Sequence, residues 1–372
     1  MSEPDDRTWM RRALALSARA LGTTAPNPPV GALIVRGGEV LGEGFTQPVG
    51  RDHAEVVAIA DCVRRGHDPA GATLVVTLEP CCHHGRTPPC VDAITAAGLS
   101  RVVVGALDPY PPMRGRGVAQ LRERGVAVEV GVEHDACARR ILGFARAVGY
   151  GLPEVTLKAA VSADGRIATA TGESKWITSP EARAAGHGLR ATHDAVLVGV
   201  QTVLADDPAL TARLPGAEAH QPVPVVLDTE LRLPDGAQLL AGGRALVVCA
   251  EDAPARTLSA EVIRVPRGPD GRTDPEAALR ALAARGLHRV LVEGGGQVHR
   301  SLLDRGLADA LELFVAPVLI PGGVPFVGGP RIEALGDAVR MTLEATERVG
   351  PDAWLRFRLR HGLVPDPHEG LR

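Results

Sequence analysis

Short apolar runs rich in valine alternate with helical patterns over the first 150 residues. The runs are VGALIV from Val30, ATLVVTL from Ala72 and RVVVGAL from Arg101. Apolar runs of this length are typical of strands buried on both faces, in a sheet that helices cover on either side. The pattern therefore predicts an α/β layer architecture.

The stretch DHAEVVAIADCVRR, between the first two runs, predicts a helix. Asp52 is placed to cap its N-terminus, so that His53 and Glu55 fall in the first turn. Apolar residues recur at helical spacing along it: Val56, Ile59, Ala60 and Val63.

A second series of strands and helices begins after GYGLPEV. Its strands are EVTLKAAV, DAVLVGV, VPVVLD, RALVVCA and HRVLVEG, and one helix opens at Ser179-Pro180-Glu181, with a cap, a first-turn proline and a first-turn acid. We place a domain boundary between Gly149 and Pro153, which gives domains 1–150 and 151–372. The last stretch, HGLVPDPHEGLR, has two prolines and no periodicity, which predicts a frayed tail.

Composition limits the classes of function. The 372 residues suit two domains with a core each. The 41 basic and 44 acidic residues give a net charge of -3, so a nucleic-acid partner is not expected and a small-molecule substrate is. The first twenty residues lack the features of a signal peptide, and no stretch is long and apolar enough to span a bilayer.

The loop TLEPCCHHGRTPPC, from Thr77 to Cys90, holds three of the six cysteines. This clustering favours a metal site in a reducing, cytoplasmic compartment over a disulfide framework. A hydrolytic zinc centre needs three protein ligands, an open position and a carboxylate that moves protons without binding the metal. His53, Cys81 and Cys90 are the predicted ligands, and Glu55 is the predicted catalytic residue.

Other assignments of this loop stay open. Cys82, His83 and His84 are equally able to ligate, and the site can be a closed structural zinc, although a closed site has no use for Glu55. Loop packing is the alternative role of the three. The remaining cysteines lie in helix or strand patterns and are expected to be buried as small hydrophobic residues: Cys62, Cys137 and Cys249.

The motifs of residues 151–372 indicate a function less specifically than those of the first half. VEGGGQ from Val292 lies between a strand and a helix and can present backbone N–H groups to a phosphate, or can simply be a tight turn. TVLADDPALTAR from Thr202 contains two acids and an arginine around a proline. These charges either bind polar groups of a ligand or are solvated on a loop. For Trp176, filling a core is commoner than stacking on a ring.

The motifs HAE and TLEPCCHHGRTPPC, with PNPPVGALIV from Pro26 and DPYPPMRGRG from Asp108, closely resemble the bifunctional riboflavin-biosynthesis deaminase/reductase family. The resemblance implies a cytidine-deaminase-like three-layer αβα domain. It also implies that Asn27, His83 and the Asp108 loop help to hold a pyrimidinone ribosyl phosphate. Two residues depart from the family pattern, Thr46 in place of a histidine and Tyr110 in place of an asparagine, so the contacts at those two positions are expected to differ from the family's.

PEVTLKAAVSADGRIA, GESKWITSPEAR and LVEGGGQ occur in the order of the same family's reductase half. This implies a dihydrofolate-reductase-like α/β domain that uses NADPH. The implied NADPH contacts are Ala160, Trp176, Thr202, Asp206, Thr229 and the turn from Gly295 to Ser301, which includes Gly296 and Gln297. The implied substrate contacts are Ser174, Arg190, Leu210, Arg213 and Glu293, with Lys158 as a further candidate.

The function implied is zinc-dependent deamination of 2,5-diamino-6-ribosylamino-4(3H)-pyrimidinone 5′-phosphate, followed by NADPH-dependent reduction of its ribosyl chain to ribityl. The alternative enzyme is a deaminase of another nucleoside or of a tRNA base fused to an unrelated α/β domain. A zinc-stabilised binding module without catalysis is the alternative from another class. A homo-oligomer and a monomer are both compatible with the sequence.

Overall fold

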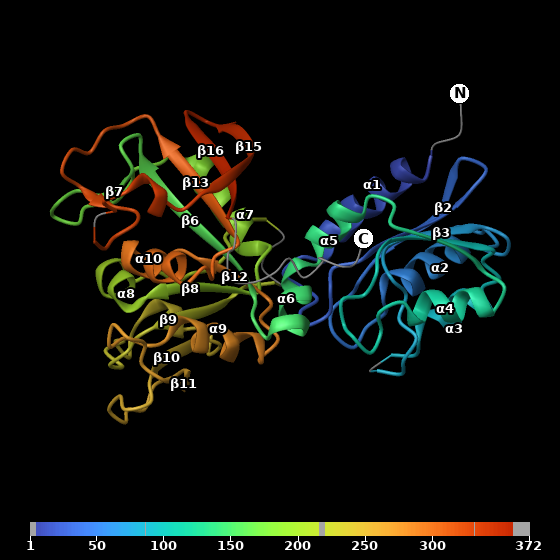
Figure 1. Cartoon of the computed structure of the whole chain (residues 1–372), viewed down its shortest axis with the longest axis horizontal. Helices are drawn as coiled ribbons and strands as arrows, with labels where there is room; N and C mark the ends of the chain where they lie inside the picture. Colours follow the sequence, from blue (N-terminus) through green and yellow to red (C-terminus); the bar gives the residue numbers. More distant parts are fainter. Residues whose placement is uncertain (1–4, 86, 216–219, 331, 360–372) are drawn as a thin grey trace. The chain divides into compact units, whose positions relative to one another are not determined.

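The structure is a computed structural model that describes residues 5–85, 87–215, 220–330 and 332–359 (Figure 1). The chain divides into two units between Gly151 and Leu152, and each unit is described by itself. The tail predicted at 361–372 lies outside the described residues.

Unit 1 contains a five-stranded sheet in the order β2-β1-β3-β4-β5. The strands are β1 Gly31–Arg36, β2 Glu39–Phe45, β3 Thr73–Leu78, β4 Arg101–Ala106 and β5 Ala127–Val130. β1 pairs antiparallel with β2 and β3, whereas β3, β4 and β5 are parallel. The three valine-rich runs are the three inner strands, which confirms the expectation that they are buried on both faces.

Helices cover both faces of this sheet (Figure 1). α1 Asp6–Ser17 and α5 His134–Arg140 pack on Leu33 and Val35 of β1. α2 Ala54–Arg64, α3 Cys90–Ala96 and α4 Arg116–Glu123 pack on the other face, with Ala32 and Ile34. The short helix η1 Ala18–Ala20 follows α1, and α6 Leu142–Tyr150 ends the unit. The predicted three-layer αβα architecture is confirmed.

Two expectations for α2 were wrong. His53, not Asp52, is its N-cap residue, with extended backbone (φ -75°, ψ 165°) and no side-chain capping bond. The buried face is also not the predicted one, since Val63 is 58% exposed. The residues of α2 that are buried are Ala54, Glu55, Ala58, Asp61 and Cys62.

Close backbone approach explains which face of α2 is buried. A Cβ atom added at Gly44 of β2 would lie 2.4 Å from the carbonyl oxygen of Ala54. α2 therefore lies against β2 through small residues, and the larger Val63 points outward. Because this packing fixes the helix from its first turn, it also fixes where His53 and Glu55 lie.

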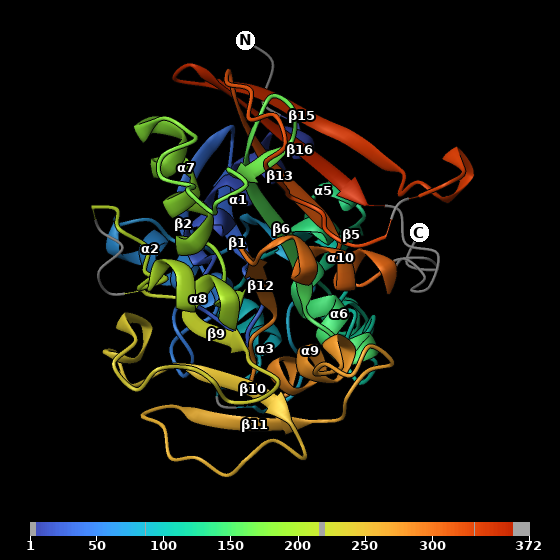
Figure 2. The same cartoon turned by 90° about the vertical axis from the view of Figure 1, so that its left-hand side faces the viewer.

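Unit 2 contains a nine-stranded sheet in the order β11-β10-β9-β8-β12-β6-β13-β16-β15. The strands are β6 Glu154–Ser162, β8 Ala195–Gly199, β9 Val223–Leu227, β10 Leu246–Ala250, β11 Glu261–Val265, β12 Arg289–Val292, β13 Ala310–Ala316, β15 Met341–Val349 and β16 Asp352–Leu359. β16 is antiparallel to β13 and β15, and the other pairs are parallel. β11 and β15 are the edge strands (Figure 2). The shorter pair β7 Arg166–Ala168 and β14 Val324–Pro325 forms a separate ladder.

Helices also cover both faces of the larger sheet. α9 Pro275–Ala283 and α10 Gly296–Asp304 pack with Leu197 of β8. α7 Pro180–Ala191, α8 Val200–Asp206 and the short helix η2 Gln238–Leu240 pack with Val196 and Val198, and η3 Leu335–Asp337 precedes β15. Ser179 caps α7 through the N–H of Ala182, as predicted.

The expectations for the burial of single side chains were confirmed for the cysteines and wrong for Trp176. The three cysteines outside the loop are buried, as expected: Cys62, Cys137 and Cys249. Core filling by Trp176 was wrong, because this side chain is 67% exposed and its ring lies 4.4 Å from the guanidinium of Arg183. The described part of the chain holds no helix that is long and apolar enough to cross a membrane.

Candidate active sites

Three predicted ligands come together in unit 1. The Nδ1 of His53 lies 3.6 Å from Sγ of Cys81 and 3.3 Å from Sγ of Cys90. His53 ends the loop before α2, Cys81 follows β3, and Cys90 is the first residue of α3. The Cys90 N–H donates to the Cys81 sulfur at 3.3 Å, which holds the two thiols side by side.

This donor set fits zinc. The ligand atoms of His53, Cys81 and Cys90 all lie within 4.8 Å of one another, and no other His, Cys, Asp or Glu of the described residues belongs to the group. One imidazole nitrogen and two thiolates are ligands that zinc prefers, and three protein ligands leave a fourth position open. A hydrogen bond from the Cys90 side chain, with smaller contributions from His53 and the Cys90 N–H, lowers the pKa of the Cys81 thiol, which favours the thiolate needed for metal binding.

Glu55 lines a cavity of about 280 Å³ beside these ligands. Its side chain is buried, and burial, followed by the charge of the Cys81 thiolate, raises the pKa of its carboxyl to about 7. The same cavity is lined by residues that the sequence singled out: Asn27, Thr46, His53, Cys81, His83, Asp108 and Tyr110. The structure thus brings the ligands, the predicted acid–base residue and the predicted substrate contacts of unit 1 to one place.

The rival ligands in the loop have other contacts. Sγ of Cys82 lies 3.8 Å from Sδ of Met113, and Nδ1 of His83 lies 2.9 Å from the same sulfur. His84 is exposed. None of the three belongs to the group of donor atoms formed by the described residues.

Sequence reasoning did not single out Glu79, which organises one wall of this cavity. Its buried carboxylate accepts the N–H groups of Asp108 at 3.0 Å, Gly115 at 2.9 Å and Val118 at 3.1 Å. A Cβ atom at Gly117 would lie 2.0 Å from the carbonyl oxygen of Pro80, so glycine permits this close approach. The signal in the sequence was an acid directly after an uninterrupted strand.

A larger cavity of about 810 Å³ lies in unit 2, at the start of α10. Seven of the predicted NADPH contacts line it: Thr202, Thr229, Gly295, Gly296, Gln297, Val298 and Ser301. Ala160, Trp176 and Asp206 are not among its lining residues. Gly295 caps α10 with extended backbone, so the N-terminal N–H groups of this helix open toward the cavity and suit a diphosphate. Arg232 and Arg272, which the sequence did not indicate, also line it.

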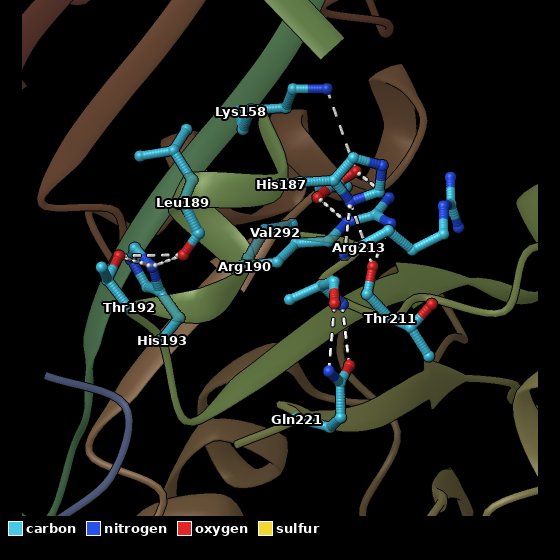
Figure 3. Close-up of polar contacts among 12 residues, drawn as sticks. Lys158, His187, Leu189, Arg190, Thr192, His193, Thr211, Arg213, Gln221 and Val292 are labelled. Atoms are coloured by element: carbon cyan, nitrogen blue, oxygen red, sulfur yellow. Dashed lines mark hydrogen bonds and ion pairs between the residues drawn. The ribbon is translucent and has the colours of Figure 1, made fainter. Parts of the chain in front are cut away.

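Three predicted substrate contacts form one polar cluster in unit 2 (Figure 3). Arg190 donates to both carboxylate oxygens of Glu293, at 2.7 and 2.8 Å, and Nζ of Lys158 lies 3.9 Å from one of them. Burial opposes ionisation of Glu293, but Lys158 and Arg190 lower its pKa to about 2. The carboxylate is therefore ionised and held in one orientation.

The other predicted substrate contacts lie on two loops. Leu210 is buried with φ of +53°, and Arg213 is exposed three residues later. Ser174 is half-buried in the loop between β7 and α7. The guanidinium of Arg190 already has internal partners, whereas no ion pair is formed by the Arg213 guanidinium within the described part of the chain.

Fold and site together define the class. A helix-covered five-stranded sheet with a His-Cys-Cys donor set and a buried glutamate is a zinc-dependent deaminase domain, and a reductase domain follows it. The family model of the cytidine and deoxycytidylate deaminase zinc-binding region matches residues 3–106, and that of the RibD C-terminal domain matches residues 153–355. The chain belongs to the RibD family, the bifunctional deaminase/reductases of riboflavin biosynthesis, with zinc and NADPH as cofactors.

Relatives match over nearly the whole chain. The riboflavin biosynthesis protein RibD of Actinobacillus pleuropneumoniae is 39% identical, over 95% of this chain and 95% of its own length. That of Escherichia coli strain K12 is 38% identical, over 95% of this chain and 99% of its own.

A solved structure from Thermotoga maritima is described as a diaminohydroxyphosphoribosylaminopyrimidine deaminase/5-amino-6-(5-phosphoribosylamino)uracil reductase. It has a TM-score of 0.85 at 35% identity, covering 95% of this chain and 99% of its own. Acinetobacter baumannii RibD has a TM-score of 0.84 at 35% identity, with the same coverage. The match to the RibD C-terminal domain contradicts the alternative in which the second half is an unrelated domain.

Proposed function

We propose that residues 1–150 deaminate 2,5-diamino-6-ribosylamino-4(3H)-pyrimidinone 5′-phosphate and that residues 151–372 reduce the product with NADPH. The observation that carries the proposal is the shared cavity of His53, Cys81 and Glu55, with Cys90 as the third donor beside it. The printed description of the Thermotoga maritima relative, which names both reactions, supports the choice of substrate.

In the deaminase step, Glu55 handles the protons. Zinc, when bound by His53, Cys81 and Cys90, supplies the Lewis acidity that makes water a nucleophile at neutral pH. Glu55 takes a proton from the attacking water and gives one to the leaving amino group, so that a C–O bond forms, the C–N bond breaks and ammonia leaves. A buried carboxyl group beside the ligands is placed for both transfers. Asn27 and His83, in the wall of the cavity, bind the substrate.

In the reductase step, the chain mainly aligns two molecules. NADPH supplies the hydride that converts the ribosyl chain to ribityl. The N-terminus of α10 at Gly295 and Gly296 holds the diphosphate of the coenzyme, and Thr202 and Thr229 bind it along the cavity. The remaining predicted coenzyme contacts, Ala160, Trp176 and Asp206, stay part of the proposal without support from the lining of the cavity.

The proposed binding site for the substrate of the reductase contains both positively and negatively charged side chains. Lys158 offers a donor and Glu293 an acceptor, and the bidentate bond from Arg190 keeps Glu293 oriented. Arg213 offers its guanidinium to the phosphate, because guanidinium presents paired donors to an oxyanion. Ser174 and Leu210 complete the proposed substrate set.

One incubation tests both halves. The purified protein is given the pyrimidinone phosphate with and without NADPH, and ammonia and NADPH oxidation are followed together. Ammonia is expected under both conditions, and NADPH oxidation only after ammonia has begun to form. NADPH oxidation without release of ammonia would contradict the order of the two reactions.

We also propose that the enzyme is a cytoplasmic homo-oligomer. All six cysteines are free thiols, as is typical of a reducing compartment. The edge strand β15 exposes Met341 and Leu343, and Leu335 and Val339 are exposed just before it. Exposed apolar edges of this kind favour pairing with another chain. Light scattering of the wild type and of Leu343→Lys measures the oligomeric state, and a monomeric wild type would contradict the proposal.

A further inference from the structure

The chain from Leu210 to Arg213 carries two of the proposed substrate contacts on irregular backbone. Residues 207–213 belong to no helix or strand, and Leu210 has φ of +53°, in the left-handed region that residues with a side chain rarely adopt. Ala212 is only 4% exposed, so water does not solvate its backbone freely. Its N–H and C=O groups must therefore find partners within the protein.

A side chain supplies those partners (Figure 3). The Ala212 N–H donates to Oε1 of Gln221 at 2.8 Å, and Nε2 of Gln221 donates to the Ala212 carbonyl at 3.0 Å. Both backbone groups of one residue are thus held by one amide, in the way that a hydrogen-bonded residue of a neighbouring antiparallel strand holds its partner. The Gln221 amide therefore supplies the two hydrogen bonds that the backbone of a neighbouring strand would otherwise supply.

Two residues of α7 form hydrogen bonds with the backbone of Thr211 and Arg213, on either side of Ala212. Nη1 of Arg190 donates to the Thr211 carbonyl at 3.0 Å, and the Arg213 N–H donates to Nδ1 of His187 at 3.3 Å. Nδ1 of His187 also lies 3.2 Å from the Thr211 carbonyl oxygen, so it accepts from Arg213 in one tautomer and donates to Thr211 in the other. Burial, followed by the charges of Arg190 and Arg213, lowers the pKa of His187 and favours the neutral ring.

We propose that Gln221 is a positioning residue for the reductase substrate: by fixing the backbone of Ala212 it directs Arg213 at the phosphate. The inference rests on the proposed function, in which Arg213 binds that phosphate. Figure 3 shows the Arg213 side chain extending away from the cluster of hydrogen bonds, so its direction depends on the backbone that carries it. Guanidinium–phosphate bonds are directional, and a rotation of this backbone displaces the guanidinium from the oxyanion.

The test is Gln221→Met, which keeps the length of the side chain and removes both amide hydrogen bonds. The KM for 5-amino-6-(5-phosphoribosylamino)uracil is expected to rise about tenfold, the effect of two lost neutral hydrogen bonds. The kcat of the reductase and the Kd of NADPH from fluorescence titration are expected to change by less than about twofold. Gln238→Met is the matched control, because the side chain of Gln238 contacts Asp207 and not residues 211–213, and its KM is expected to equal that of the wild type.

A double-mutant cycle shows whether Gln221 acts through Arg213. Arg213→Ala alone raises the substrate KM, and adding Gln221→Met raises it no further. Two effects that multiply would overturn the positioning role, as would an unchanged KM in Gln221→Met or an equal loss of substrate and NADPH binding. An unchanged KM in Arg213→Ala alone would instead remove the phosphate contact from the proposed function, and the role of Gln221 with it.

Discussion

Glu55 is a buried acid in the wall of a cavity that the proposed ligands His53 and Cys81 also line. Replacing it with glutamine keeps its size and removes its ability to take up a proton. We expect Glu55→Gln to release ammonia at least about 100-fold more slowly than the wild type, as the loss of a general acid–base residue does. Zinc content, measured by atomic emission, is expected to stay unchanged because Glu55 is not one of the three donors.

Reduction of the deaminated compound by the same preparation is the internal control for Glu55→Gln. Glu43→Gln serves as the matched variant, since Glu43 is an acid of unit 1 that pairs with Arg12 and Arg65 outside the cavity. Deamination at the wild-type rate in Glu55→Gln would remove this residue from the proton transfers.

Two cysteines of the same loop have different surroundings. Sγ of Cys90 lies 3.3 Å from Nδ1 of His53, whereas Sγ of Cys82 contacts Met113. We expect Cys90→Ser to retain less than about a tenth of the zinc, since loss of a thiolate leaves only two protein ligands. Cys82→Ser is the matched control and is expected to keep its zinc and its deaminase activity. Loss of zinc from Cys82→Ser would make Cys82 a ligand.

At the scale of elements, one carboxylate holds the segment from Asp108 to Val118, which is a loop followed by the first turn of α4. Glu79 accepts three backbone N–H groups of this segment, and Asp108, Tyr110 and Met113 of the loop line the same cavity as Glu55. Glu79→Gln replaces one acceptor oxygen with a donor, which leaves at least one N–H without a partner. We expect the KM for the pyrimidinone phosphate to rise about tenfold, with bound zinc unchanged. An unchanged KM would show that the loop holds its shape without this carboxylate.

The end of α7 gives the reductase unit a pH dependence of stability. His193 is buried and its Nδ1 contacts the carbonyl of Leu189 at 2.7 Å. Burial lowers its pKa to about 3 from the ordinary value of 6.5. Between these values the unfolded chain binds a proton that the folded chain does not. The stabilisation is therefore complete above pH 6.5 and is lost as the pH falls toward 3.

At pH 5 this single group is expected to cost about 2 kcal/mol of unfolding free energy. Urea unfolding at pH 7.5 and pH 5 measures the difference, and His193→Asn is expected to show a smaller difference than the wild type by that amount. His220→Asn, at an exposed histidine of the same unit, is the control and is expected to behave as the wild type. Equal pH dependence in all three proteins would contradict a neutral, buried His193.

Elements with strong local patterns could be predicted from the sequence, and those set by packing could not. Valine-rich runs located β1, β3 and β4, and Ser179-Pro180-Glu181 located the start of α7. The buried face of α2 was missed because it is set by the glycines of β2, which accept small residues and leave Val63 outside. β15 was missed because nearly all of its residues are exposed and no alternation marks one face.

The same distinction applies to the sites. His53, Glu55, Cys81 and Cys90 could be predicted because their residue types and spacing are those of zinc chemistry, and the structure places them together. The contacts of unit 2 followed only from the family resemblance. Lys158, Arg190 and Glu293 are far apart in the sequence and meet because β6 and β12 are neighbours in the sheet and α7 packs beside them. Spacing along the chain does not carry that information.

At the scale of the whole molecule, each unit has its own core and its own cavity, and the proposed zinc ligands all belong to unit 1. Removal of zinc is therefore expected to separate the two activities. Protein treated with a chelator is expected to release no ammonia from the pyrimidinone phosphate, because the electrophile that activates water is gone. NADPH oxidation with 5-amino-6-(5-phosphoribosylamino)uracil is expected to keep its wild-type kcat and KM within about twofold. Restored ammonia release on adding zinc back is the control, and parallel loss of both activities would show that the reductase depends on the metal site of unit 1.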